Sequence, residues 1–274
     1  MRKEIKKVIK EFSESGQKTV YLVEHEDYGR CIYKIIKNKT GFERAERECK
    51  WQIKNESEYF PKNLEYIKEE NTFVLYEEYI DAPTLEECKD KFYKNEKLVI
   101  NFFDQMLNGL ELLWNGDNIH RDLKPANIMV RENCKPVILD LGIAKFSSLP
   151  TLTSPDFIPH TKIYAAPEQL EGARALQNFK IDLFSLGIIM AELYMGRHPF
   201  AKEKYKESDD EYKYYEYCES IAENIKTGNL YLDDDISEQL KKLLKKLLSK
   251  KQNQRYRRIE DIKEYLKSNW GGLS

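Results

Sequence analysis

The first third of the chain contains runs of β-branched and aromatic residues that are typical of strands. Two such runs, at 19–25 and 31–37, flank a turn-forming segment at 27–29 and therefore predict an antiparallel hairpin. A third run at 72–80 predicts another strand, which ends at the Asp-Ala-Pro segment 81–83. This part of the chain has the pattern of a small antiparallel sheet.

Helical patterns lie within and after this region. The charged segment 41–54 has the composition of a helix. Apolar residues recur at helical spacing in 98–114 and on one face of 236–247, whereas 181–195 is apolar on nearly all sides, as a buried helix is. Strands first and helices later predict an α+β fold, with a small β-rich lobe joined at 81–83 to a larger, mostly helical lobe.

The composition fits a folded, near-neutral protein of 274 residues. The chain has 3 Trp, 18 Tyr and 12 Phe, which supports a packed core although 34% of its residues are charged. Its 45 basic and 47 acidic residues give a net charge of −2, so no broad footprint for nucleic acid is expected. The most apolar run, 183–191, is too short to span a membrane, and the five cysteines form no C-x-x-C pair. We expect a cytoplasmic protein with reduced thiols and no signal peptide or membrane segment.

The residues best suited to chemistry gather in the segment Ile-His-Arg-Asp-Leu-Lys-Pro-Ala-Asn-Ile-Met at 119–129. Asp122 can orient and deprotonate a hydroxyl group, and Lys124 can neutralise charge on a phosphoryl group. Asn127 can offer an amide oxygen to a hard cation. Asp140 follows an apolar strand a few residues later. A carboxylate and an amide oxygen placed this way predict a Mg²⁺ site.

The order and spacing of these motifs resemble those of eukaryotic-like serine/threonine protein kinases. His-Arg-Asp-Leu-Lys-Pro-Ala-Asn at 120–127 resembles the catalytic loop H-R-D-L-x-x-x-N. Asp-Leu-Gly at 140–142 resembles D-F-G, and Ala-Pro-Glu at 166–168 resembles A-P-E, preceded by Thr-Lys-Ile-Tyr at 161–164. The abundance of Lys, Glu, Asn, Ile and Tyr indicates an AT-rich genome, such as that of a bacterium or a mobile element.

The resemblance implies a bilobal kinase fold that forms a single domain over 1–274. The N-lobe is then expected at about 1–80, the hinge at about 78–83 and the C-lobe at about 84–270. The implied activity transfers the γ-phosphoryl group of Mg-ATP, with Mn²⁺ as an alternative metal, to Ser or Thr hydroxyls of protein substrates, including the chain itself. Lys124 and Thr161 are similar to the residues of Ser/Thr kinases rather than tyrosine kinases.

The resemblance also assigns roles to individual charged residues. Asp122 is the catalytic base, and Asn127 and Asp140 are the metal ligands. Lys34 matches the lysine that binds the α- and β-phosphates. Its expected carboxylate partner is Glu48, with Glu46 as the second candidate.

The adenine pocket and the hinge carry over in the same way. The apolar residues that enclose adenine correspond to Val20, Ile32 and Met129. Ile32 replaces a smaller alanine and should narrow the pocket. The backbone of Glu78 and Ile80 would bond the edge of adenine, which puts Glu77 at the gatekeeper position; a slip of one residue would put Tyr76 there instead.

The glycine-rich loop departs from the family pattern. The pattern G-x-G-x-x-G-x-V falls on 13–20, where Ser13, Ser15 and Lys18 replace the three glycines and Gly16 lies one place over. Side chains with a Cβ approach phosphates less closely than glycine does. Two interpretations remain: a working variant in which Lys18 adds positive charge near the phosphates, or weakened nucleotide binding.

Four further residues are expected to be structural. The resemblance implies that His120 packs and bonds the backbone, that Asp182 braces the catalytic loop, and that Glu168 and Arg255 form an ion pair. Regulation by phosphorylation of the loop before A-P-E is a further expectation, with Arg121 as the residue that would bind the phosphate. The candidate regulatory residues are Arg121, Thr151, Thr153, Ser154 and Thr161.

Other functions remain open at this stage. A pseudokinase would fit the altered glycine-rich loop but not the intact Lys34, Asp122 and Asp140. A small-molecule phosphotransferase would share the catalytic loop but usually lacks A-P-E. The polar, Tyr-rich stretch 203–219 is either a solvated loop or exposed helix, or a docking surface for a partner. The sequence predicts no particular substrate protein or oligomeric state.

Overall fold

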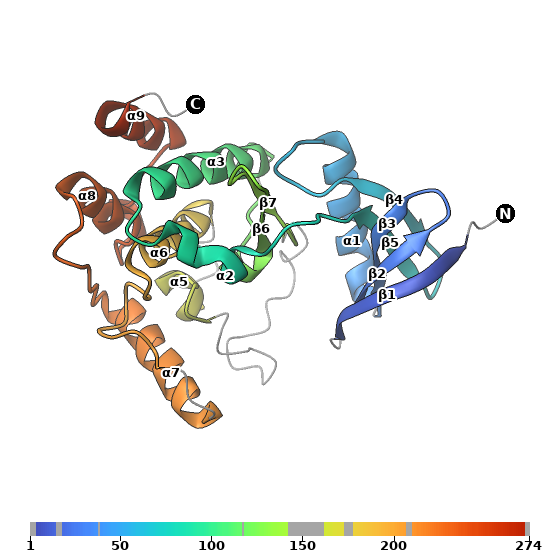
Figure 1. The fold of residues 1–274 in the computed structure, drawn as a ribbon, viewed down its shortest axis with the longest axis horizontal. Coiled ribbons are helices and arrows are strands. Elements are labelled where there is room, and N and C mark those ends of the chain that lie inside the picture. The colour runs from blue at the N-terminus through green and yellow to red at the C-terminus, as the bar shows by residue number, and fades with distance from the viewer. Residues whose placement is uncertain are drawn as a thin grey trace.

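The computed structural model describes most of the chain. The described residues are 4–14, 18–37, 39–116, 118–141, 162–172, 178–206 and 210–271. Figure 1 shows a β-sheet at one end of the molecule and a group of helices at the other. The chain passes between these two parts after residue 78. The predicted α+β fold with two lobes is confirmed.

The N-terminal lobe is built on one antiparallel sheet. Within the described residues, its strands follow the order β1-β2-β3-β5-β4. They are β1 Ile5–Glu14, β2 Lys18–His25, β3 Gly29–Ile36, β4 Asn63–Lys68 and β5 Phe73–Glu78, with helix α1 Lys39–Lys54 between β3 and β4. The predicted hairpin is β2–β3, with His25 paired to Gly29 at its turn. Gly29 has a φ of 62°, which favours glycine at this position.

The two faces of the sheet have different surroundings. Strand pairing sets Lys34 opposite Val20 on one side and opposite Leu75 on the other, so these three side chains share a face. Leu75 packs there with Phe42 of α1. The opposite face is aromatic: the Tyr33 and Tyr76 ring centroids are 5.0 Å apart. The parity of the strands therefore places Lys34 and Tyr76 on opposite faces.

The C-terminal lobe consists mainly of helices. Its longer helices are α3 Glu96–Trp114, α6 Lys180–Met195, α7 Glu211–Thr227, α8 Glu238–Leu247 and α9 Ile259–Trp270. Its shorter elements are α2 Leu85–Cys88, α5 Pro167–Leu170, the 3₁₀ turns Lys89–Phe92, Pro125–Asn127 and Gln252–Gln254, and the strand pair β6 Ile128–Val130 and β7 Pro136–Ile138. Asn95 caps α3 by accepting a hydrogen bond from Leu98 N, and Ser237 caps α8 through Leu240 N.

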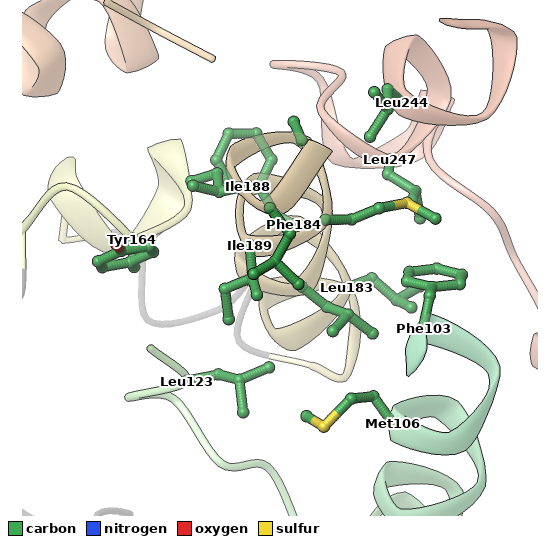
Figure 2. Close-up of a cluster of buried hydrophobic side chains, with 14 of the residues drawn as sticks. Phe103, Met106, Leu123, Tyr164, Leu183, Phe184, Ile188, Ile189, Leu244 and Leu247 are labelled. Atoms are coloured by element: carbon green, nitrogen blue, oxygen red, sulfur yellow. The ribbon is translucent and has the colours of Figure 1, made fainter. Parts of the chain in front are cut away.

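The hydrophobic core of this lobe surrounds α6. Figure 2 shows Phe103 and Met106 of α3 and Leu244 and Leu247 of α8 pointing toward α6 from neighbouring helices. These four side chains are buried, as are nearly all residues of α6 itself. The all-round apolar pattern of 181–195 thus correctly predicts a central helix. Gly196 ends the helix in a left-handed conformation with a φ of 69°.

The structure adds elements that the sequence patterns do not predict. Strands β1 and β4 and helix α9 are the main additions. Within the Tyr-rich stretch, α7 begins after its N-cap Asp210, so part of this stretch is helical. Tyr212 and Tyr215 are exposed there. Along the described parts of the chain, no helix combines the length and the apolar character needed to cross a bilayer.

Candidate active site

Hydrogen bonds to Asp182 of α6 hold the catalytic-loop segment in place. This side chain is fully buried and accepts hydrogen bonds from His120 N at 2.9 Å and Arg121 N at 2.8 Å. It also accepts one from Trp114 Nε1 of α3 at 2.8 Å. A carboxylate that accepts several N–H groups fixes the backbone that donates them. The core helix thereby sets the position of the residues that follow in the loop.

His120 connects this loop to the chain segment after β7. The His120 ring is fully buried, and its Nε2 lies 2.9 Å from the carbonyl oxygen of Leu139. With Nε2 as the donor to that carbonyl, Nδ1 accepts from Asp122 N at 3.3 Å. Leu139 N also donates to Asn127 O at 2.9 Å. These bonds hold the segment that carries Asp140 beside the catalytic loop.

Asp122, Lys124 and Asn127 converge within one turn of chain. Asn127 Nδ2 donates to Asp122 O at 2.8 Å and to Asp122 Oδ2 at 3.3 Å. Lys124 Nζ lies 3.6 Å from Asp122 Oδ1. The side chains of Asp122 and Lys124 remain 20% and 23% exposed, so incoming groups can reach them. This arrangement supplies a carboxylate base and a cation next to each other.

Asp140 lies at the junction between the two lobes. Its Oδ2 accepts from Lys18 Nζ at 2.8 Å, and its Oδ1 lies 3.3 Å from Lys34 Nζ, so both oxygens meet lysines of the sheet. Burial opposes ionisation, but Lys18 and Lys34 hold the pKa of Asp140 well below its usual range. Asp140 has a φ of 52°, a left-handed conformation that Asp tolerates better than most residues. The carboxylate is therefore ionised and partly exposed.

The ion-pair partners of Lys34 do not include Glu48, the carboxylate that the resemblance implies. The ion pairs of Lys34 are with Glu77 Oε2 at 2.5 Å and Asp140 Oδ1 at 3.3 Å, and none forms with Glu48. Although burial lowers it, the pKa of Lys34 lies above its ordinary value because Glu77 and Asp140 favour the charged form. Glu46, the second candidate, instead pairs with Lys68 of β4 at 2.5 Å.

The register of β3 and β5 explains why Glu77 lies beside Lys34. Glu77 is opposite Ile32 on β3, and Ile32 lies two residues from Lys34, so Glu77 and Lys34 share a face. Tyr76 lies on the other face with Tyr33. Of the two alternatives for the gatekeeper position, the structure places Glu77 beside Lys34.

Glu48 lies near this cluster in a different state. Burial, with Asp140 nearby, raises the pKa of Glu48 to about 7, and the attraction of Lys34 only partly offsets this. Carboxylates usually titrate near pH 4. Glu48 is thus only partly ionised at neutral pH, which weakens it as a partner for a lysine.

The residues expected around adenine lie where the lobes meet. Val20 of β2 and Ile32 of β3 are half-buried, and Met129 of β6 pairs with Thr84 just after the inter-lobe segment. Ile80 is buried. Glu78 has its side chain tied across the lobes, since its Oε1 lies 3.3 Å from Arg131 Nη2.

The donor set fits a hard divalent cation. Asn127 directs its Nδ2 toward Asp122, and no hydrogen bond from a described residue reaches its Oδ1. The Asp140 carboxylate is ionised and 41% exposed. An anionic oxygen and a free amide oxygen on adjacent segments are ligands that Mg²⁺ accepts.

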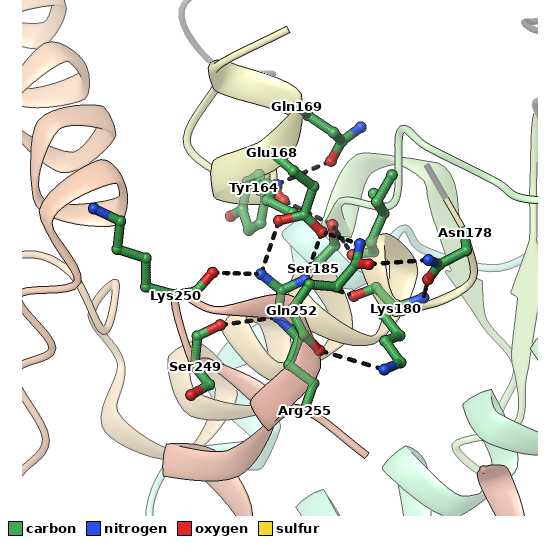
Figure 3. A network of polar contacts seen from close by, with 12 residues as sticks. Tyr164, Glu168, Gln169, Asn178, Lys180, Ser185, Ser249, Lys250, Gln252 and Arg255 are labelled. Carbon is green, nitrogen blue, oxygen red and sulfur yellow. Dashed lines mark hydrogen bonds and ion pairs between the residues drawn. The ribbon is translucent and has the colours of Figure 1, made fainter. Parts of the chain in front are cut away.

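The expected Glu168–Arg255 pair forms deep in the helical lobe. Arg255 Nη1 lies 2.7 Å from Glu168 Oε1, and Nη2 lies 2.9 Å from Oε2. Figure 3 shows the backbone carbonyls of Ser249, Lys250 and Lys180 bonding the remaining guanidinium donors. Gln252 Nε2 adds a bond to Glu168 Oε1 at 2.8 Å, a contact that no sequence motif indicates.

Several predicted residues lie outside the described part of the chain. They are Ser15 and Gly16 of the expected phosphate loop, Gly142, and the regulatory candidates Thr151, Thr153, Ser154 and Thr161. Ser13 is described through its backbone, which pairs with Val20 where β1 leads into β2. The contact between Lys18 and Asp140 was not predicted, although the charge of Lys18 within the glycine pattern was a usable signal.

Comparisons with known proteins point to one family. Residues 14–270 match the family model of the protein kinase domain. "Serine/threonine-protein kinases PknA" of Corynebacterium glutamicum is 34% identical over 105 residues, which cover 38% of this chain and 22% of that protein. "Probable serine/threonine-protein kinase mkcE" of Dictyostelium discoideum is 30% identical over 141 residues, covering 52% and 19%. A Mycoplasma pneumoniae protein with a name of the same class is 32% identical over 150 residues, covering 48% and 39%. The matches thus span 39% or less of each relative.

Proposed function

This chain belongs to the protein kinase family, and from that premise we propose that it transfers the γ-phosphoryl group of ATP to Ser or Thr hydroxyls of protein substrates. The observation that carries the proposal is the convergence of Asp122, Lys124 and Asn127 in one loop that is bonded to the segment of Asp140. The names of the matched relatives support Ser and Thr as the acceptors.

The proposed reaction relies on positioning and charge. Asp122 accepts a hydrogen bond from the substrate hydroxyl and takes its proton as the hydroxyl oxygen bonds to the γ-phosphorus of ATP. The bond between the γ-phosphorus and the oxygen that bridges it to the β-phosphate breaks, and ADP leaves with that oxygen. Lys124, which lies beside Asp122, stabilises negative charge on the transferred group. Lys34 binds the α- and β-phosphates, and Asp140 with Asn127 would hold Mg²⁺, with Mn²⁺ as the alternative. When bound, the metal neutralises phosphate charge.

Lys18 supports the interpretation of the glycine-rich loop as a working variant. Its ammonium reaches Asp140 at 2.8 Å from the first residue of β2. A cation that reaches the expected metal ligand is also within reach of phosphates bound there. We therefore propose that Lys18 offsets part of the loss of the three glycines by adding charge to the phosphate site.

The proposal is tested with radiolabelled ATP, the purified chain and a generic basic protein substrate. Asp122→Asn should reduce transfer by about 10²–10⁴-fold because it removes the base. Calorimetric ATP binding by this variant should stay close to that of the parent chain. Asp90→Asn, an exposed residue in the same lobe, is the matched control and should transfer normally. Full phosphotransfer by Asp122→Asn would refute the assignment.

The same assay addresses the two alternative functions. ATP binding by the parent chain without any transfer would support a pseudokinase, in which the two lysines keep Asp140 from the metal. Transfer to small molecules but not to proteins would support a small-molecule phosphotransferase. The matched region includes Ala166–Glu168, which favours protein substrates.

A further inference from the structure

The ammonium of Lys34 is shared among acidic groups from three segments of the chain. Glu77 of β5 is the nearest, at 2.5 Å, and Asp140 lies at 3.3 Å. Glu48 of α1 attracts Lys34 electrostatically but forms no ion pair with it. Lys18 of β2 is the second cation of this cluster and contacts Asp140.

The sheet itself holds Lys34 and Glu77 together. β3 and β5 are adjacent antiparallel strands, in which Lys34 is opposite Leu75 and Ile32 is opposite Glu77. Lys34 and Glu77 are therefore diagonal neighbours on one face, a separation that long side chains can bridge. The contact depends on backbone hydrogen bonds between two strands. It does not require helix α1 to approach the sheet.

Burial makes this contact hard to replace. The side chains of Lys34 and Glu77 are 13% and 5% exposed. Lys34 is the one ion-pair partner that Glu77 has among the described residues. A buried carboxylate without its partner is strongly disfavoured, so Glu77 has little freedom to leave Lys34.

The contact with Asp140 is the weaker of the two. It is longer by 0.8 Å (3.3 Å against 2.5 Å), and the Asp140 side chain is 41% exposed. An ammonium has three N–H donors. Glu77 can keep one of them while phosphate oxygens take the place of Asp140.

We propose that Glu77 is the residue that positions Lys34 for the nucleotide phosphates, in the place that the resemblance assigns to Glu48. This inference rests on the proposed kinase function. Glu77 acts through Lys34 and touches no reacting atom, so it is a positioning residue. The location of the carboxylate on the sheet makes the placement of Lys34 independent of helix α1.

The first test measures Lys34 directly and needs no catalysis. The full chain is treated with acetic anhydride at a single pH near 8, and the rate of acetylation of Lys34 is followed by mass spectrometry. Glu77→Gln should raise this rate, because Lys34 loses the carboxylate that contacts its ammonium at 2.5 Å. Glu48→Gln, the matched control, should raise the rate less. An equal or larger increase with Glu48→Gln would overturn the proposal.

The second test measures ATP kinetics with the same variants. Glu77→Gln should lower kcat/KM by about 10- to 100-fold, mainly through KM for ATP, because Lys34 is misplaced. The loss with Glu48→Gln should be smaller. The reverse order would overturn the proposal while leaving the kinase function intact, whereas a parent chain with no activity would refute the function and leave the labelling result valid.

A second pair of variants, with conservative substitutions, keeps the test valid if the Gln variants fail to fold. Glu77→Asp keeps the charge but withdraws it by one methylene group, and Glu48→Asp is its control. The melting temperature of each variant is compared with that of the parent. The proposal requires Glu77→Asp to raise the acetylation rate of Lys34 more than Glu48→Asp does, and the opposite result contradicts it.

Discussion

The Arg255–Glu168 pair and the Lys34–Glu77 pair are both buried, but the protein surrounds them differently. Arg255 and Glu168 are 0% and 4% exposed, and the carbonyl groups of the helical lobe satisfy the remaining guanidinium donors. Every bond of this pair stays within one lobe (Figure 3). Such a pair stabilises one arrangement of the chain and leaves no donor for a ligand.

The cluster of acidic groups around Lys34 draws on both lobes. Glu77 and Asp140 contact Lys34, Glu48 lies nearby, and Asp140 belongs to the other lobe. The exposed Asp140 leaves one side of this cluster open to incoming groups. The two buried pairs therefore differ in what they leave available. The Arg255–Glu168 pair has no donor left for a ligand, whereas Lys34 has a partly exposed partner, Asp140, which phosphate oxygens would replace under the proposed function.

The largest expected effect on stability concerns the Arg255–Glu168 pair. Arg255→Ala leaves Glu168 buried without its partner, which should lower the free energy of unfolding by about 3–5 kcal/mol. Denaturant unfolding and soluble yield would measure this loss, with the exposed Arg257→Ala as the control. A normal melting temperature together with lost phosphotransfer would show that the pair is not structural and would break the comparison.

A pH-dependent effect is expected at Glu48, which lies beside the Lys34 cluster. The pKa of Glu48, about 7 in the folded protein, exceeds its ordinary value of 4.5. The folded state therefore binds a proton that the unfolded state releases, and stability falls as pH rises from about 4.5 to 7. Glu48→Gln removes this penalty. Allowing for partial exposure, it should raise the free energy of unfolding by on the order of 1–3 kcal/mol at pH 8.

The pH at which the gain appears is the decisive part of this result. At pH 5 the Glu48→Gln gain should be much smaller, since Glu48 is protonated in the folded state there. Glu46→Gln on the same helix is the control: Lys50 and Lys68 lower the pKa of Glu46 to about 2, so its loss should not stabilise the protein. An equal gain from Glu48→Gln at both pH values would show that ionisation of Glu48 is not responsible.

The sequence predicts the parts of the fold that repeat a local pattern. The hairpin of β2 and β3 and the buried helix α6 follow from residue periodicity alone. Strand β1 does not, because its apolar residues Ile5, Val8, Ile9 and Phe12 break the alternation of a regular strand. Its pairing with β2 shifts register at three places, which is consistent with the broken alternation.

In the candidate site, as in the fold, the sequence predicts local proximity but not contacts between distant segments. Asp122, Lys124 and Asn127 lie in one short segment, so their proximity is encoded locally. The contact of Lys34 with Glu77 joins residues on two strands and depends on register, where a slip of one residue exchanges Glu77 for Tyr76. The ionisation of Glu48 depends on burial by distant segments. Neither property can be obtained from local pattern.

The smallest effect on stability is expected at Lys18, the more exposed of the two lysines that contact Asp140. The Lys18 and Asp140 side chains are 33% and 41% exposed, so Lys18→Met should change the free energy of unfolding by less than about 1 kcal/mol. The KM for ATP should nevertheless rise about fivefold, the equivalent of about 1 kcal/mol, if Lys18 binds phosphates as proposed. Steady-state kinetics and denaturant unfolding are compared with those of Lys7→Met, an exposed lysine of β1. An unchanged KM would mean that Lys18 does not offset the missing glycines, whereas a loss of stability above 2 kcal/mol (roughly twice the range of exposed pairs) would place Lys18 with the structural pairs.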